Sequence, residues 1–181
     1  NSQVRLIFDR VTGEILTAQG SGQATITLED EEVQMYGDFR IREGEYQFVS
    51  GDIFRRRFYL QNGGSIVWEG PIDNARLNIN AVYRARPDIS VLLPTANRQN
   101  QISQRVPIEL LLQITGNIES IENSFSFRLP SEIDISRGDI ALQNVINQLN
   151  NSGNKLIQAT SLLLTDSFIP VSETGNVSNQ E

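Results

Sequence analysis

The sequence predicts an all-β fold, namely a curved antiparallel sheet with one apolar face and a short helical segment near the C-terminal end. Two observations lead to this fold class. Through most of residues 1–129 apolar side chains occupy every second position, which places them on one face of a pleated sheet. The runs are short and separated by turn residues, as in an antiparallel meander, and the twist of such a sheet makes it curl.

The first segment contains one short predicted strand, from Val4 to Phe8, and a turn around Thr12-Gly13. Because the strand pattern is already under way in the first residues, we expect the chain to be a piece of a longer protein. Gly20-Ser21-Gly22 follows, and two glycines around a serine indicate a flexible joint.

A regular alternation comes next and predicts two strands joined by a turn. The acidic run from Glu29 to Glu32 forms the turn, and Gly37 indicates a bulge or a close approach of another backbone. The apolar positions are Ala24, Ile26, Leu28, Val33, Met35, Phe39 and Ile41.

The segment from Gly44 to Tyr83 carries the most informative strand pattern in the chain. It predicts three strands separated by turns that contain glycine. Aromatic side chains crowd into this one stretch. Its alternating residues are Tyr46, Phe48, Phe54, Phe58, Leu60, Ile66, Trp68, Ala75, Leu77, Ile79, Ala81 and Tyr83.

Further strands are predicted after this segment. Ile89 to Leu93 alternates, and residues 95–104 are polar and form a surface loop. Val106 to Ile114 has the clearest alternation in the chain, and Gly116-Asn117 forms the turn before a strand that ends at Leu129.

The period changes after residue 137 from strand-like to helix-like. Asp139 is the expected N-cap of a helix, and Asn150 to Gly153 its expected end. Lys155 to Ile169 fits a helix or a strand. The apolar face of the first helix consists of Leu142, Val145, Ile146 and Leu149.

The chain has 181 residues, which suits one domain or one domain with a tail. We expect a curved β-sheet domain over 1–137, a helical or mixed segment over 138–170, and a disordered tail over 171–181.

The composition argues against catalysis. Histidine and cysteine are both absent, which removes nucleophile–His–acid triads, disulfides and thiolate metal sites. The adjacent carboxylates from Glu29 to Glu32 lie in a predicted turn without an apolar pocket, so we expect them to be solvated. An enzyme built on carboxylates alone is the remaining catalytic alternative.

The charge pattern gives little support for nucleic-acid binding. The net charge is −7, and Lys155 is the single lysine. The longest basic run, Arg55-Arg56-Arg57, alternates across both faces of a predicted strand and is typical of a solvated, protected sheet edge. No apolar run reaches the roughly 18 residues that a membrane-spanning helix needs.

The apolar face of the sheet remains as the candidate working surface. If the sheet packs shut, this face is an ordinary core, which is the interpretation that alternation alone favours. If the sheet stays open, the face lines a groove that binds acyl chains.

Three motifs connect this chain to a known family. They are G-x-Y-x-F at 44–48, F-x-L-x-x-G-G-S-I-x-W-x-G at 58–70 and N-A-x-L-x-I-x-A-x-Y at 74–83. Together they resemble the C-terminal domain of TamB-family proteins, which belong to the AsmA-like group. The resemblance is close over Thr25 to Leu93, and the segment from Gly153 to Pro170 resembles the closing segment of Bacteroidetes-type members.

The resemblance implies a fold and a location. Family members look like long sheets curled into a taco or gutter with an apolar inner face, in the periplasm of diderm bacteria. An N-terminal transmembrane helix, which is missing from this chain, anchors them in the inner membrane. The C-terminal end lies near the outer membrane and meets a barrel protein of the TamA/BamA type that carries POTRA domains.

The resemblance also implies non-enzymatic work in envelope biogenesis: phospholipid transport between the two membranes, assembly of outer-membrane barrel proteins, or both. No cofactor is expected, although phospholipid or detergent acyl chains can bind. The implied groove residues are Phe39, Ile41, Tyr46, Phe48, Phe58, Leu60, Ile66, Trp68, Leu77, Ile79, Ile89, Val91, Leu110 and Leu112.

The C-terminal segment has two interpretations. It docks onto the barrel partner or a sheet edge, or it simply caps the open end of the sheet. The docking candidates are Leu156, Leu162, Leu163, Leu164, Phe168 and Ile169.

The alternative for the whole chain is a structural or adhesive β-domain on a bacterial surface, with its apolar core closed.

Overall fold

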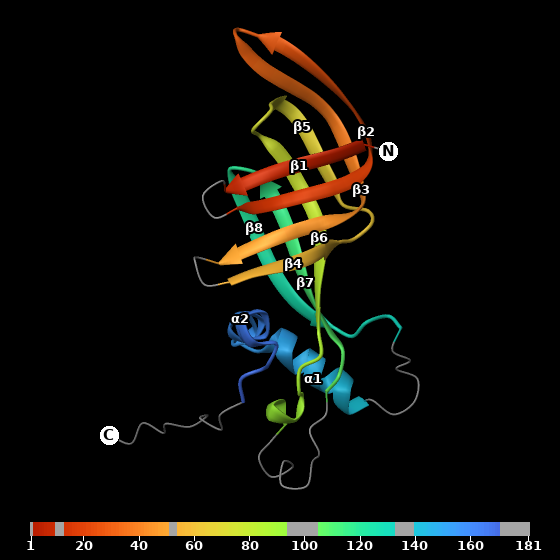
Figure 1. Cartoon of the computed structure of the whole chain (residues 1–181), viewed down its shortest axis with the longest axis vertical. Helices are drawn as coiled ribbons and strands as arrows, with labels where there is room; N and C mark the ends of the chain where they lie inside the picture. Colours follow the sequence, from red (N-terminus) through yellow and green to blue (C-terminus); the bar gives the residue numbers. More distant parts are fainter. Residues whose placement is uncertain (1, 10–12, 51–53, 94–104, 133–139, 171–181) are drawn as a thin grey trace, which may run out of the picture. The chain divides into compact units, whose positions relative to one another are not determined.

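The computed structural model describes residues 2–9, 13–50, 54–93, 105–132 and 140–170. It is mostly antiparallel sheet with two short helices toward the C-terminal end, which confirms the predicted fold class (Figure 1). The chain divides into two compact units, Asn1–Arg84 with Glu109–Arg128, and Ala85–Ile108 with Leu129–Glu181. The expected boundary at residue 137 stays a prediction.

One curved sheet accounts for the first unit, and it does not close into a barrel. Its hydrogen-bonded order is β1-β2-β3-β4-β6-β7-β8, and β5 pairs with both β3 and β6. The strands are β1 Ser2–Asp9, β2 Glu14–Glu29, β3 Glu32–Ser50, β4 Phe54–Leu60, β5 Ser65–Pro71, β6 Ala75–Ala85, β7 Ile108–Asn117 and β8 Ser120–Arg128.

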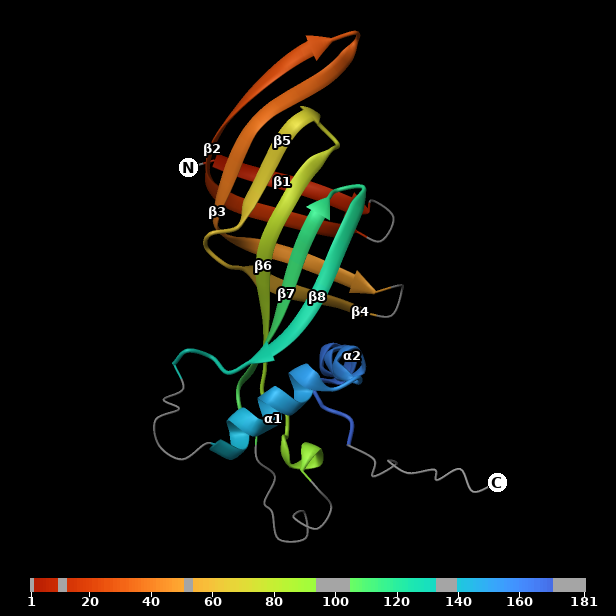
Figure 2. The same cartoon turned by 180° about the vertical axis from the view of Figure 1, so that it is seen from behind.

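The long β2–β3 hairpin is shared by two parts of this sheet (Figure 2). The first part of β3, Gln34 to Arg40, pairs with β5, whereas Gly44 to Ser50 pairs with β4. Between these parts the register shifts at Gln19 and Gly20, because β3 has one more residue than β2 there. A bulge of this kind bends the strand and increases its twist.

The prediction of a flexible joint at Gly20-Ser21-Gly22 was wrong, because all three residues lie inside β2. A Cβ atom on Gly20 would lie 1.9 Å from the carbonyl oxygen of Arg40, so glycine serves close backbone packing here. The predicted close approach at Gly37 is confirmed: its φ is +146°, and a Cβ would lie 2.0 Å from the carbonyl oxygen of Gln23.

The acidic turn is confirmed. Glu29 pairs with Glu32, and the two residues between them, Asp30 and Glu31, have φ values of 50° and 67°. Positive φ at both central residues is typical of a type I′ hairpin turn, whose twist matches that of the flanking strands.

Three sequence expectations need correction. The Gly44 to Tyr83 stretch contains four strand segments, the end of β3 followed by β4, β5 and β6, and not three. The strand expected at Ile89 to Leu93 is instead a 3₁₀ helix, η1, at Ser90–Leu92. Its cause is local, since the Asp88 carboxylate accepts a hydrogen bond from the Ser90 N–H at 2.9 Å and so turns the chain.

The hairpin between β7 and β8 also turns later than expected. Asn117 pairs with Ser120, so the turn is Ile118-Glu119 and not Gly116-Asn117.

The second unit contains η1, α1 (Ile140–Asn151) and α2 (Lys155–Thr165). The segment left open between helix and strand is therefore a helix through Thr165. It ends at Asp166, which has a left-handed conformation and donates its N–H to the Leu162 carbonyl. The predicted face of α1 is buried: Leu142, Val145, Ile146 and Leu149.

Two hydrogen bonds from α2 hold the segment that follows this helix. The Gln158 side chain accepts a hydrogen bond from the Ile169 N–H at 3.0 Å and donates one to the Ile169 carbonyl at 2.9 Å. Neither helix in the described part of the chain is long and apolar enough to cross a membrane. The expectations for Thr12, Asp139, the 95–104 loop and the 171–181 tail lie outside the described residues.

Candidate functional site

The apolar inner face of the curved sheet is the candidate site. Twelve of the predicted groove residues lie in the first unit, and all of these except the half-buried Phe48 are buried. Ile89 and Val91 belong to the second unit, beside and within η1. The structure thus brings the predicted set together on the sheet, apart from these two.

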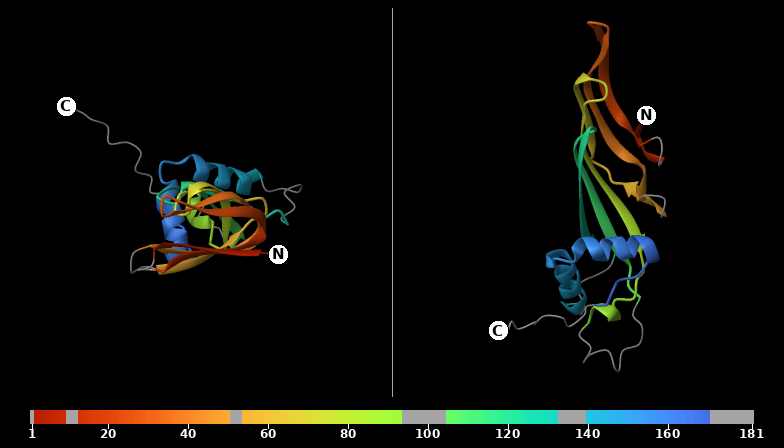
Figure 3. Two further views of the ribbon diagram at one scale, coloured as in Figure 1. Left: turned by 90° about the horizontal axis from the view of Figure 1, so that it is seen from above. Right: turned by 90° about the vertical axis from the view of Figure 1, so that its left-hand side faces the viewer.

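An aromatic cluster packs this face shut where the sheet curls. Figure 3 shows the part of the first unit with β1 and β4 facing the part with β7. The rings of Phe48 and Phe125, from β3 and β8, are 6.2 Å apart and join these two parts. Such pairs are worth about 0.5–1.5 kcal/mol beyond the burial of area. The other ring pairs are Phe8–Tyr46, Tyr46–Phe48, Tyr46–Phe58, Phe48–Phe54, Phe48–Phe58 and Phe58–Tyr83.

Tyr46 is the polar member of this cluster. Its side chain is buried, and its hydroxyl donates a hydrogen bond to the Glu14 carboxylate. Burial, and next the hydrogen bond and the negative charge of Glu14, raise the pKa of Tyr46 well above its ordinary value. The hydroxyl therefore stays protonated and works as a donor that ties β3 to β2.

The same apolar face continues past the core and is uncovered toward the tip of the β2–β3 hairpin. Ile26 pairs with Met35, and Leu28 with Val33, on the face that also carries the buried Phe39. Yet Ile26 is 63% exposed, Leu28 73% and Val33 45%. Met35 is half-buried, and we call the three exposed residues, Ile26, Leu28 and Val33, the uncovered strip. The alternation in the sequence contains these residues, but only the structure reveals that nothing in the chain's described part covers them.

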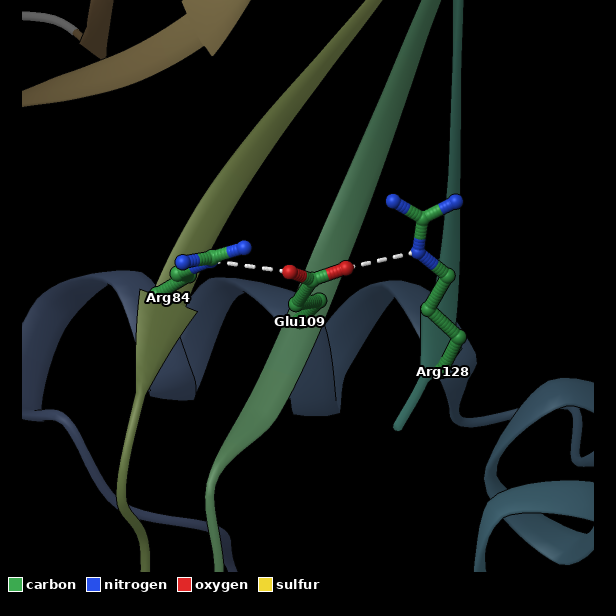
Figure 4. Close-up of polar contacts among 3 residues, drawn as sticks. All are labelled: Arg84, Glu109 and Arg128. Carbon is green, nitrogen blue, oxygen red and sulfur yellow. Dashed lines mark hydrogen bonds and ion pairs between the residues drawn. The ribbon is translucent and has the colours of Figure 1, made fainter. Parts of the chain in front are cut away.

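A second feature, which the sequence did not predict, lies on the face of β7 that points away from the apolar inner face. The Glu109 carboxylate, 2% exposed, accepts hydrogen bonds from Nε of Arg84 at 2.8 Å and Nε of Arg128 at 2.7 Å (Figure 4). A buried carboxylate is tolerated when charged partners satisfy both oxygens. The sequence held one signal of this feature, because Glu109 is a single acidic residue at the start of an otherwise apolar strand.

The docking candidates divide into two groups. Leu162, Leu163 and Phe168 are buried, whereas Leu156, Leu164 and Ile169 are exposed. The three exposed residues belong to α2 and the segment just after it.

Among the described residues, no group of three or more acidic, histidine or cysteine side chains is placed to hold a metal. A family model, the TamB C-terminal domain, matches residues 1–181, the full length of the sequence. The chain belongs to the TamB family. None of the curated proteins compared with the chain matches it.

The TamB family gives this domain a general role in building the bacterial envelope. The family consists of periplasmic envelope proteins that act as non-enzymatic transport and assembly modules. In general its members work with TamA-type partners. The sequence resemblance to TamB is thereby confirmed.

The Tyr46 hydrogen bond predicts a measurable pH dependence. The native state keeps the Tyr46 proton above pH ~10, where the unfolded chain loses it, so the free energy of unfolding falls there by up to about 1.4 kcal/mol per pH unit. Tyr46→Phe should lower stability by about 1–3 kcal/mol at pH 7 and remove this alkaline slope. Urea unfolding between pH 7 and 11 measures both effects.

The control for this prediction is Tyr59→Phe, which removes an exposed hydroxyl from the neighbouring strand β4. It should leave the alkaline slope of the unfolding free energy unchanged. Parallel curves for Tyr46→Phe and the wild-type chain would contradict the role assigned to the buried hydroxyl.

Proposed function

We propose that this TamB domain works in the periplasm near the outer membrane, where it contacts the acyl chains of phospholipids that move between the inner and outer membranes. The observation that carries the proposal is the uncovered strip. Large exposed apolar surfaces mark interaction sites in soluble proteins. Each acyl methylene that leaves water on such a surface contributes about 0.8 kcal/mol, without any directional contact.

The position of the strip supports an acyl-chain surface better than a single pocket. β5 pairs with the same part of β3, and it puts Ile66 opposite Phe39 and Trp68 opposite Gly37 on the same face. Ile66 and Trp68 are buried, so the strip is the exposed continuation of a packed apolar floor. In this proposal the twelve predicted groove residues on the sheet form that floor, and lipid meets the face first at Ile26, Leu28 and Val33.

The strip can be tested without disturbing the core. Ile26→Glu with Leu28→Glu places two charges where acyl chains would lie, and both sites are exposed. We expect phospholipid that co-purifies with the chain to fall sharply and the affinity for a lipophilic dye to drop at least about tenfold. Lipid mass spectrometry and dye fluorescence provide the two measurements.

The matched control is Gln23→Glu with Thr25→Glu, on the same strand but the opposite face, where both residues are exposed. It adds the same charge and should leave lipid and dye binding unchanged. Equal binding by the two double variants would sink the proposal. Substitutions such as Leu110→Asp are less informative, since Leu110 is buried and its loss would disturb the fold.

We further propose that the C-terminal segment docks onto a TamA/BamA-type barrel protein with POTRA domains, and so assists barrel assembly. Leu156, Ile157 and Leu164 lie on one side of α2 and are exposed, and Ile169 follows them. The buried candidates, Leu162 and Leu163, support the helix and would not themselves touch the partner. An apolar helix face of this kind suits a groove on another protein.

Docking predicts a specific loss of partner binding. Leu156→Asp with Leu164→Asp should abolish pull-down of the detergent-solubilised barrel partner, because a charge buried in an apolar interface lacks compensation. Asn144→Asp with Asn147→Asp adds the same charge at exposed positions of α1 and serves as the control. If both variants retain the partner equally, the exposed side of α2 is not the docking surface.

One observation favours a second candidate function, a structural or adhesive β-domain with a closed core. The buried state of eleven of the twelve groove residues on the sheet is what a closed domain requires. This candidate predicts that the Ile26 and Leu28 variants bind as little lipid as the wild-type chain, which the same lipid measurement decides.

A further inference from the structure

The strand β8 forms one edge of the curved sheet. In the described part of the chain it pairs with β7 alone and ends the strand order. In an antiparallel pair alternate residues bond to the partner strand, and the residues between them direct their N–H and C=O groups away from it. Over residues 120–126 these outward groups have no partner among the described residues, so another strand can join them.

This edge lacks the features that usually prevent strands from pairing. The opposite edge of the sheet, β1, carries the exposed Arg5 in its middle. β8 contains no lysine, arginine or proline before its last residue, Arg128, and its register with β7 has no bulge. A long, regular edge of this kind is suited to pair with a further strand.

The apolar face is incompletely covered at the same edge. Ile121 and Phe125 lie on the face of β8 that carries the buried Phe127. Both are half-buried, even though the Phe125 ring packs against the ring of Phe48 on β3. A strand added beside β8 would remove more of their apolar surface from water, which favours association.

Two opposite charges identify the strand that fits this edge. Glu122, on the outer face of β8, is exposed and has no ion-pair partner among the described residues. Arg128, on the same face, contacts Glu109 through Nε, and in Figure 4 its terminal nitrogens point away from that carboxylate. The two charges stand three residues before and three residues after Phe125.

We propose that two copies of this chain pair antiparallel along β8, with Phe125 of each copy opposite Phe125 of the other. In this register Glu122 of each copy lies opposite Arg128 of the second copy, and Ser124 lies opposite Ser126. Opposite charges at directly opposed positions stabilise a pair of strands. A shift by one residue would reverse the two faces, and a shift by two would leave both charges without an opposite partner. The proposal does not rest on lipid contact.

Sedimentation equilibrium of the full chain measures the dissociation constant of the dimer. The paired segment is short for a protein interface, so we expect a micromolar value. Glu122→Lys places like charges opposite each other twice and should raise the dissociation constant at least about tenfold. The matched control, Glu119→Lys, makes the same change of charge at an exposed residue of the β7–β8 turn and should change it less than about twofold.

The register is tested by disulfide formation, because the chain has no cysteine of its own. Ser124→Cys and Ser126→Cys chains, one of them labelled with nitrogen-15, are mixed and oxidised. Residues directly opposite each other come within reach of a disulfide, whereas diagonal neighbours lie farther apart. We expect the mixed disulfide to exceed both symmetric ones in the mass spectrum. Ser21→Cys, exposed on β2, measures the yield of random collisions.

Each of the other outcomes overturns the proposal. A chain that stays monomeric at its highest soluble concentration would leave the β8 edge to a strand of another protein. Equal dissociation constants for Glu122→Lys and Glu119→Lys exclude the proposed register, and tighter association of Glu122→Lys would mean that Glu122 protects the edge. Loss of the dimer in Ile26→Glu with Leu28→Glu, but not in Glu122→Lys, would assign self-association to the uncovered strip.

Discussion

The bend in the β2–β3 hairpin determines how the other strands of the sheet pair. One extra residue in β3 shifts the register beside Gln19 and Gly20, and both strands turn there without ending. The hairpin can then pair with β5 before the bend and with β4 after it. Because β3 turns in this way, Phe48 near its end meets Phe125 on β8, a strand four places away in the sheet order. The backbone packing at the bend leaves no room for a side chain on Gly20.

Because of this bend, the apolar face of the sheet is buried in one part and exposed in another. Where the sheet curls, aromatic rings fill the space between its facing parts. The hydrogen bond from the buried Tyr46 hydroxyl to the Glu14 carboxylate holds this aromatic cluster in position. Toward the hairpin tip nothing in the described chain faces Ile26, Leu28 and Val33, so the same face remains exposed. A TamB domain built in this way combines a packed scaffold with an exposed apolar surface, as the proposed contact with lipid requires.

The alternation in the sequence was sufficient to predict the sheet and its inward set apart from Ile89 and Val91, because each run of alternating residues marks its own apolar face even though the register shift changes the parity between Ile41 and Tyr46. Two predictions failed because of local interactions. The Asp88 side chain turns the chain after Pro87 into η1, where a strand was expected. Gly20 allows close backbone packing, where a flexible joint was expected. Exposure was beyond prediction, since Leu28 and Leu110 occupy equivalent alternating positions and differ only in what lies opposite them. The ion pairs of Glu109 with Arg84 and Arg128 join strands distant in sequence, which no local pattern reveals.

In the proposed function, lipid meets the inner face at the uncovered strip, and the curled part of the sheet stays packed. A phospholipid with a photoreactive diazirine at the end of its acyl chain, cross-linked to the full chain and mapped by mass spectrometry, tests this directly. We expect adducts on residues 24–35 and none on the buried inner residues of β6 and β7. Adducts concentrated around Leu77, Ile79 and Leu110, with the hairpin tip unlabelled, would contradict lipid contact at the uncovered strip and favour a groove that opens along the whole sheet.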